Sequence, residues 1–463
     1  MRVIRQGDRE YDKLLQTLNR RYKPDQKVRA AVGAILESVA REGDDALVRF
    51  TREFGGPGLD ARMLGVGHDE LDAARAGLSR EVRKAILSAK SNVRAFAKRG
   101  LRKSWFTKNR QGAIVGERFD PFQRVGIYVP GGTAPLVSTA VMTCTLAAAA
   151  GVAEIVAVTP PLRGGSLQPA LLGALAECGA TEVYRVGGAQ AVAALAFGTR
   201  TIRPVQKVFG PGNAYVVEAK RQVFGHVAID LLPGPSEILV IADDSANPEW
   251  IAADLLAQSE HGQGSIAILL TTSPRLLERV NDSIKRQLSL SARPKELGLA
   301  MKNASLVLVG DLETAVALAN QFSAEHVAIA ATHPGEVASR LTTSGAIFMG
   351  GISPVVGGDF VAGPSHELPT GGAAKSFSGL TADQFQHRTS IVMFDEASLR
   401  ASLPVIETFS RIEGLDAHGR SASIRLDSSK ARINGTVNQP PRGLAPGTHT
   451  KVESRKPSSR KVN

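Results

Sequence analysis

The pattern of apolar and polar positions changes character near residue 124. Before it, apolar residues recur three or four apart, which predicts helices over about 26–54 and 69–100 and a short amphipathic helix within 1–22. The stretch 59–67 lacks this period and is expected to be a loop or an edge strand. After residue 124, short runs of Val, Ile and Leu alternate with helical stretches, as they do in βαβ units.

Two successive series of five strands are predicted in that region. The first series covers 124–129, 154–159, 182–186, 207–209 and 227–231, and the second covers 237–241, 266–270, 306–309, 326–330 and 346–349. Beyond residue 379, helices are expected to about residue 412, followed by a short strand over 422–426. The predicted fold class is α/β, with two Rossmann-like domains built on parallel sheets and small helical segments at both ends.

Composition adds a charged tail to this picture. The chain has 463 residues, more than one ordinary core holds, and its 43% hydrophobic and 22% charged residues are typical of a globular protein. Half of the net charge of +12 lies in residues 427–463, which carry eight Lys or Arg against two acidic residues and are expected to be disordered. A solvated appendage is favoured over an electrostatic contact with RNA or an acidic partner, so no nucleic-acid partner is expected.

The expected location is cytoplasmic. Cys144 and Cys178 cannot form a disulfide framework or a thiolate zinc site, and both are expected to be inert thiols in buried helices. Residues 1–8 lack the apolar core of a signal peptide. The uncharged run 126–153 is long enough to span a bilayer, but its prolines and glycines predict a strand, a turn and a buried helix, so no membrane contact is expected.

Glycine-rich loops follow four strands of the first series. They are 130–132, just after Tyr128, and 187–190, 210–213 and 233–237. Glycines let a ligand approach the backbone, and the helices that follow offer N–H groups to phosphate. Ordinary strand-to-helix turns are the alternative, and no loop matches the G-x-G-x-x-G fingerprint. Four such loops at one edge of a sheet nevertheless favour a nucleotide or dinucleotide site.

A second set of polar residues has the chemistry of a metal site. Gln258 and His261 lie three apart where a predicted helix ends, so they share a face, although such a pair alone is more often a solvated helix end. Together with Asp359 and His418 they would form a mixed nitrogen and oxygen shell. That shell suits zinc or a similar divalent ion with positions left for substrate.

Glu325 and His326 combine a carboxylate and an imidazole on adjacent residues, as a general acid–base pair requires. Neighbouring residues in a strand point to opposite faces, so a loop conformation is needed for both to serve one site.

The order of these motifs resembles the histidinol dehydrogenase family, with matches running over residues 25–426. The strongest segment is Ile229-Asp230, Gly234-Pro235-Ser236-Glu237 and Asp254-Leu255-Leu256 leading to Gln258-Ser259-Glu260-His261. Supporting matches are 43–47, 128–132, 186–191, 209–213, 325–326, 358–359, 366–370 and 413–418. The resemblance implies an oxidoreductase that converts L-histidinol to L-histidine, the last step of histidine biosynthesis. It does so in two successive hydride transfers to NAD through bound histidinal, with one Zn²⁺ per subunit.

The resemblance also implies roles at matching positions. Zinc would be bound by Gln258, His261, Asp359 and His418, and NAD would be contacted by Tyr128, Gln190 and Asn213. Glu325 and His326 would be the catalytic acid–base residues. Substrate would be contacted by Ser236, His366 and Glu413, together with the zinc ligands and His326. The family is a homodimer whose C-terminal segment crosses to the partner, so His418 and Glu413 would be donated across the interface.

These implications divide the chain into five parts. They are an N-terminal helical segment 1–24, an α/β domain of 25–123 and 236–380 carrying the metal and acid–base residues, a Rossmann-like cofactor domain 124–235, a small C-terminal dimerisation domain 381–426, and the basic tail 427–463.

Three positions depart from the family pattern. Thr133-Ala134-Pro135 replaces a stretch that often carries Lys or Arg, Ala328 replaces a common acidic residue, and Ser365 stands where Asn is common. The tail beyond Leu426 is extra. The alternative is therefore a paralogous zinc- and NAD-dependent dehydrogenase of another amino alcohol or polyol, which the presence of Ser236, His366 and Glu413 argues against.

Overall fold

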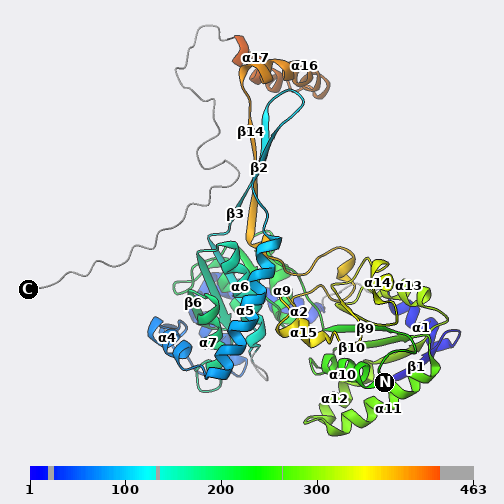
Figure 1. Cartoon of the computed structure of the whole chain (residues 1–463). Coiled ribbons are helices and arrows are strands. Elements are labelled where there is room, and N and C mark those ends of the chain that lie inside the picture. The colour runs from blue at the N-terminus through cyan, green and yellow to red at the C-terminus, as the bar shows by residue number, and fades with distance from the viewer. Residues whose placement is uncertain (19–24, 132–135, 263, 428–463) are drawn as a thin grey trace, which may run out of the picture. The chain divides into compact units, whose positions relative to one another are not determined.

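The structure, a computed structural model, describes residues 1–18, 25–131, 136–262 and 264–427 (Figure 1). The chain forms two compact units. One contains Met1–Leu101 and Pro121–Phe385, and the other contains Arg102–Asp120 and the segment that begins at Gln386. The departure at 133–135 and the tail from residue 428 lie outside the described residues.

A five-stranded parallel sheet forms the core of one half of the first unit. Its order is β6 (Glu182–Arg185), β5 (Glu154–Thr159), β4 (Arg124–Tyr128), β7 (Lys207–Phe209) and β8 (Ala228–Ile229). The strand order reverses between β4 and β7, which makes their carboxyl ends the expected ligand crevice. The five strands predicted for this series are confirmed, with β8 shorter than expected.

This sheet is covered by helices that lie between its strands in the sequence and by helices that precede its first strand. Those between the strands are α6 (Val137–Ala150), α7 (Pro169–Cys178), α8 (Gly188–Phe197) and α9 (Ala214–Val223). The earlier ones are α2 (Gln26–Glu42), α3 (Asp44–Glu53), α4 (His68–Ala76) and α5 (Arg80–Gly100), and a 3₁₀ turn at Ala61–Met63 lies within the predicted loop.

The packing of the early helices differs from the predicted domain division. That division placed residues 25–123 with the second sheet, whereas apolar side chains of α2, α3 and α5 are buried in the hydrophobic clusters of the five-stranded sheet. An amphipathic helix shows that it has a buried face but does not identify the sheet that covers it.

Cys144 and Cys178 are both free and buried in helices on this sheet, as predicted. Burial raises the pKa of the Cys178 thiol to about 11, which keeps it in the protonated, unreactive form at neutral pH.

The other half of the first unit is a six-stranded parallel sheet. Its order is β1 (Arg2–Arg5), β11 (Ser305–Leu308), β10 (Ile266–Thr271), β9 (Glu237–Ala242), β12 (His326–Ala330) and β13 (Ala346–Met349). The five strands predicted for this series are confirmed. The sixth, β1, corrects the expectation that residues 1 to about 22 form a short helix, because among the described residues 1–18 only Arg9–Leu18 (α1) are helical. β1 has four residues, and its partner β11 begins at Ser305. So short a strand with so distant a partner leaves no local signal in the sequence.

Its helices are α10 (Pro248–Ser259), α11 (Pro274–Leu290), α12 (Pro294–Ala300), α13 (Leu312–Phe322), α14 (Pro334–Ser339) and α15 (Val355–Phe360). Ala328, one of the departures from the family pattern, lies in β12 and is buried in the hydrophobic cluster that includes Leu255 and Val355. No helix among the described residues is long and apolar enough to cross a membrane.

The second unit combines a three-stranded sheet with a helical hairpin. The sheet has the order β14 (Gln386–Met393), β3 (Ile114–Pro121) and β2 (Trp105–Lys108), with β2 and β3 antiparallel. The hairpin is α16 (Glu396–Glu413) and α17 (Asp416–Asp427). Two predictions were wrong: β14 was expected to be helical, and the strand expected at 422–426 is part of α17. Gly419 and Ala422 are buried, and a Cβ on Gly419 would crowd Ser410 of α16, so helix packing overrides the local pattern.

Candidate active site

Helix α10 holds Gln258 in its last turn and ends two residues before His261, the second predicted metal ligand. Asn247 caps it as predicted, its Oδ1 accepting the Glu249 N–H at 2.9 Å, and Pro248 occupies the first turn. Gln258 lies in the last turn and is 3% exposed, and its Nε2 has no hydrogen-bond partner among the described residues. His261 follows the helix and is exposed. A buried amide without a partner is costly, so the position fits a ligand that the protein alone does not supply.

The predicted acid–base residues lie at the amino end of β12, beside the start of β9. His326 begins β12, while Glu325 precedes the strand, so both side chains reach one place despite being adjacent. Glu325 Oε2 lies 3.5 Å from His326 Nδ1. Open α/β sheets usually bind ligands at the carboxyl ends of their strands. The six-stranded sheet instead presents Glu325 and His326 at the amino end of β12.

Glu237, at the start of β9, connects the two residues and was not singled out for a role from the sequence. Its N–H donates to Glu325 Oε2 at 2.8 Å, and its carbonyl oxygen lies 3.1 Å from His326 Nδ1. Its carboxylate Oε1 accepts the Gly371 N–H at 3.1 Å. The only available signal was its place in the motif Gly234-Pro235-Ser236-Glu237.

The environment drives the two pKa values in opposite directions. Burial lowers the pKa of His326 to about 4, with the hydrogen bond to Glu237 opposing the shift and His261 and His366 adding to it. Burial raises the pKa of Glu325 well above its ordinary value. His326 is therefore neutral at neutral pH, and the surroundings of Glu325 favour the uncharged carboxyl over the carboxylate.

Asp359 and His366 complete the group from the first unit. Asp359, in α15, has Oδ1 3.7 Å from His326 Nε2, and burial raises its pKa to about 6. Its carbonyl oxygen lies 2.9 Å from His366 Nδ1, and His366 Nε2 lies 3.4 Å from Thr139 Oγ1 in α6. Burial lowers the pKa of His366 to about 4. Ser365 is buried, and its Oγ accepts the Glu367 N–H at 3.2 Å.

The predicted site residues Glu413 and His418 belong to the second unit. Glu413 is the last residue of α16, and His418 lies in the first turn of α17. Both are exposed in the single chain. Among the described residues, no three His, Cys, Asp or Glu side chains converge closely enough to hold a metal ion. The metal shell expected from Gln258, His261, Asp359 and His418 therefore stays a prediction.

A pocket of about 650 Å³ lies at the carboxyl edge of the five-stranded sheet. Tyr128, Gln190 and Asn213, which are the three predicted NAD contacts, all line it. Its far wall, which the sequence did not predict, comes from α2 and the end of α3 at Ala31, Ile35, Thr51, Phe54, Gly55 and Gly56.

Three details fix the polar side of this pocket. Gly188 N–H donates to Tyr128 Oη at 3.1 Å. Asn213 Oδ1 caps α9 by accepting from Tyr215 N–H at 3.0 Å. Gln190 is buried, and its Oε1 has no partner among the described residues. The pocket therefore offers a buried amide, with an unpaired acceptor, to a polar ligand.

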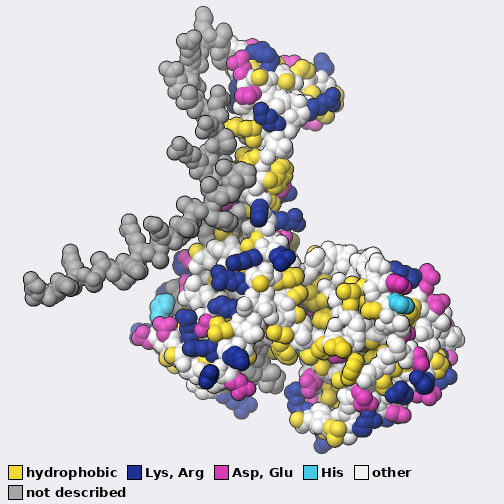
Figure 2. Space-filling view, viewed as in Figure 1, with side chains coloured by type: hydrophobic (Ala, Val, Ile, Leu, Met, Phe, Trp, Pro, Cys, Tyr) yellow, Lys and Arg dark blue, Asp and Glu magenta, His cyan; other side chains and the backbone are white. Residues whose placement is uncertain are grey.

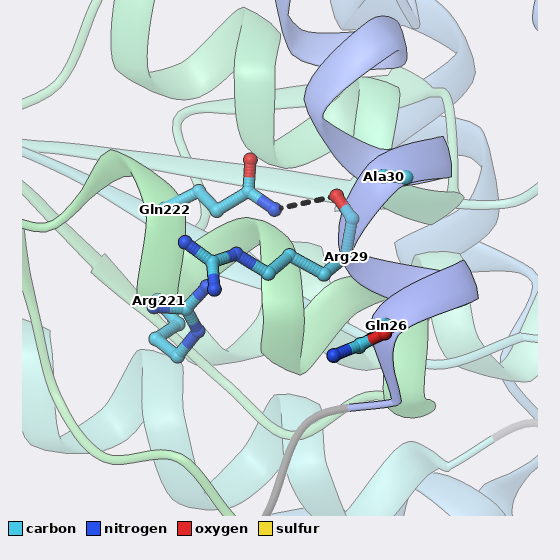
Figure 3. A pocket seen from close by; sticks show the side chains of 5 residues that line it. All are labelled: Gln26, Arg29, Ala30, Arg221 and Gln222. Atoms are coloured by element: carbon cyan, nitrogen blue, oxygen red, sulfur yellow. Dashed lines mark hydrogen bonds between the residues drawn. The ribbon is translucent and has the colours of Figure 1, made fainter.

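A second hollow, of about 620 Å³, lies at the other end of α9 from Asn213 (Figure 3). Gln222 Nε2 donates to the Arg29 carbonyl oxygen at 2.9 Å, and Arg221 Nε donates to Glu218 Oε2 at 2.7 Å. The Gln222–Arg29 contact holds α2 against α9, and the Arg221–Glu218 pair lies within α9, so the hollow is explained by packing.

Fold and site together define an α/β enzyme in which a nucleotide-type pocket accompanies a buried acid–base pair and metal-type donors. The family model for histidinol dehydrogenase matches residues 18–426, and the chain belongs to that family. It is 43% identical over 403 residues to a histidinol dehydrogenase from Geobacillus kaustophilus, covering 87% of this chain and 95% of that protein. A Synechococcus histidinol dehydrogenase is 44% identical over 400 residues, covering 86% and 92%.

A solved structure supports the same assignment. The crystal structure of histidinol dehydrogenase from Elizabethkingia anophelis superposes with a TM-score of 0.87 at 33% identity, covering 93% of this chain and 99% of that one.

Proposed function

We propose that the protein oxidises L-histidinol to L-histidine in two successive NAD-dependent steps through bound histidinal. Relatives that cover most of the chain carry the name histidinol dehydrogenase. The structural observation that carries the proposal is the placement of the His326 ring 3.5 Å from the Glu325 carboxyl and 3.7 Å from that of Asp359. Oxidation of an alcohol needs a base for the hydroxyl proton, and His326 Nε2 provides one next to the metal-type donors.

His326 acts first. The Glu237 carbonyl can only accept, so Nδ1 carries the proton and Nε2 presents its lone pair. Nε2 takes the hydroxyl proton of histidinol as a hydride leaves the carbinol carbon, which gives the aldehyde. One NAD molecule would accept that hydride, and a second NAD molecule would accept the hydride of the later step.

Glu325 acts on the aldehyde. In its ionised form, with its proton released to solvent, the carboxylate acts as the base, and its raised pKa makes it a stronger one. It then takes a proton from a water molecule that adds to histidinal, giving the hydrate. Loss of a hydride from the hydrate carbon and a proton from its oxygen yields the acid.

Zinc would be held by Gln258, His261 and Asp359 of one chain and by His418 of the partner subunit. Zinc has no redox chemistry and would hold the amine and imidazole of the substrate in place. Gln258 would bind it through the amide oxygen, and Asp359 through a carboxylate that has no Lys or Arg within ion-pair distance among the described residues.

NAD would occupy the 650 Å³ pocket, against Tyr128, Gln190 and Asn213. Ser236, His366 and Glu413 would contact histidinol. His366 is suited to this because its pKa is low and it stays neutral, so its ring can hydrogen-bond without repelling a cation.

A homodimer would supply the missing donors. The second unit exposes large apolar side chains, namely Val392, Phe394, Val405, Phe409, Ile412, Leu415 and Ile424. An exposed apolar surface of this kind marks an interface. Ile412 and Leu415 flank Glu413, so covering them with a second copy would bring Glu413 and His418 towards the partner.

The decisive test is NADH production from L-histidinol, before and after treatment with a chelator and after adding Zn²⁺ back. Other amino alcohols and polyols are assayed in parallel. We expect two NADH per histidinol, loss with the chelator and recovery with zinc. No turnover of histidinol together with turnover of another alcohol would replace the substrate by the alternative.

A further inference from the structure

A buried ion pair lies beside the loop that borders the cofactor pocket. Lys220, in α9, is fully buried, and its ammonium group pairs with the carboxylate of Asp230, which is also buried. Removing two charges from water is costly, and the attraction between them often does no more than offset that cost. The pair therefore needs an explanation beyond stability.

Both partners also bind the backbone of Gly210. Lys220 Nζ donates to the Gly210 carbonyl oxygen at 2.7 Å, and Asp230 Oδ2 accepts the Gly210 N–H at 2.8 Å. Gly210 has a φ of +108°, and a Cβ there would collide with the carbonyl of Tyr128. The pair thus holds both polar groups of a residue whose conformation only glycine readily adopts.

This loop sets one wall of the cofactor pocket. It runs from Gly210 to Asn213, which caps α9 and lines the pocket, as Tyr128 does. Lys220 reaches back from later in the same helix, so the loop is fixed at both ends. Asp230 begins the segment that leads from β8 to Ser236 and β9, which joins the cofactor edge to the acid–base edge.

We propose that Lys220 and Asp230 are positioning residues for NAD, which hold loop 210–213 so that Asn213 and Tyr128 keep their places on the pocket. This inference rests on the assignment of NAD to that pocket. Neither side chain lines the pocket, so the pair acts through Gly210.

Glu367 is the third ionisable group of this cluster. It is buried, and neither of its carboxyl oxygens has a hydrogen-bond partner among the described residues. Burial and the charge of Asp230 raise its pKa well above the ordinary value, while Lys220 opposes the shift. Glu367 directly follows His366, a proposed contact of histidinol, so this cluster also adjoins the substrate site. The test therefore measures the binding of histidinol separately from the binding of NAD.

The test compares Lys220→Met, Asp230→Asn and the double variant in the full-length enzyme. Each single variant leaves one buried charge without its partner, so we expect a lower melting temperature and a KM for NAD raised about tenfold, with the KM for histidinol changed less than about twofold. The double variant removes the unpaired charge, so its melting temperature recovers. The Gly210 carbonyl still lacks its donor, so the KM for NAD stays raised.

A double variant with wild-type KM for NAD would show that the pair is merely structural and would overturn the inference. Should the double variant fail to fold, Lys220→Arg takes its place. Arginine keeps the buried charge but cannot place the same donor on the Gly210 carbonyl. A raised KM for NAD in this variant supports the inference, and a wild-type KM overturns it.

Two control variants separate this inference from the proposed function. Arg124→Met breaks another buried ion-pair cluster, at the amino end of β4, and is expected to lower the melting temperature without changing the KM for NAD. Gln190→Ala alters the pocket itself and is expected to raise the KM for NAD. If Gln190→Ala leaves the KM for NAD unchanged, the assignment of NAD to this pocket is overturned. If Gln190→Ala raises that KM but the Lys220 and Asp230 variants do not, only the positioning role is overturned.

Discussion

His326 and Glu237 are joined through the His326 ring and the Glu237 backbone, with Nδ1 3.1 Å from the carbonyl oxygen. The same residue donates its N–H to Glu325 at 2.8 Å. One backbone unit at the start of β9 therefore fixes the tautomer of the base and the position of the acid. The connection uses main-chain atoms of Glu237, and its side-chain carboxylate accepts the Gly371 N–H.

Replacing His326 by Gln should lower kcat for histidinol by about 10²–10⁴-fold, because the proton acceptor for the alcohol is lost. Zinc content, measured by metal analysis, should stay at the wild-type level. His333→Gln, at an exposed histidine, is the matched control and should retain full activity. A His326→Gln enzyme with near-wild-type kcat would contradict the role of His326 as base.

Glu325→Gln should separate the two oxidations. The amide can still accept the Glu237 N–H, but it cannot take a proton from water. We expect oxidation of added histidinal to fall by about 10²-fold or more, and the first oxidation of histidinol to fall less. Stopped-flow measurement of NADH formed per active site distinguishes the steps. Equal losses in both would contradict a role specific to hydration.

The shared metal site predicts complementation between inactive subunits. His261→Ala and His418→Ala homodimers should each lose most of their zinc and activity. Mixed under conditions that exchange subunits, they should regain activity, because one of the two sites in a heterodimer has all its ligands. Native mass spectrometry verifies the exchange. Heterodimers that form but stay inactive would contradict donation of His418 across the interface.

Acid stability should depend on Glu182. The Arg124 guanidinium donates to Glu182 at 2.6 and 2.8 Å and holds the pKa of that carboxyl at about 2, below its ordinary value of 4.5. The folded-state pKa is depressed, so the stabilisation is complete above about pH 4.5 and is lost as the pH falls towards 2.

Glu182→Gln should therefore lower the free energy of unfolding by roughly 1–2 kcal/mol at pH 7, a figure discounted for solvent screening. The difference from wild type should shrink as the pH is lowered from about 4.5, which urea denaturation at several pH values measures. Glu37→Gln, at an exposed position, is the control and should have no comparable effect. A difference independent of pH would contradict the ion-pair explanation.

Removal of residues 428–463 should leave dehydrogenase activity unchanged. The family match ends at residue 426, and the predicted site residues all precede it. Steady-state kinetics of the truncated and full-length enzymes test this. Loss of activity in a truncated enzyme that still folds and forms dimers would contradict the view of the tail as a solvated appendage.

The amino-acid sequence by itself determined the ten predicted strands and the helix cap at Asn247, because these depend on local periodicity and capping. It also determined which residue types could do the chemistry. The order of the motifs indicated the family. The helix face that Gln258 and His261 were expected to share stays a prediction, because α10 ends at Ser259 and His261 lies beyond it.

Only the tertiary structure decided the features that depend on distant pairing. β1 is a strand because β11 lies beside it, and residues 422–426 are helical because α17 packs on α16. The pKa values of Glu325 and His326 move apart because of burial, which the sequence does not state. The role of the Glu237 backbone and the Lys220–Asp230 pair likewise depends on contacts between segments that chain spacing does not bring together.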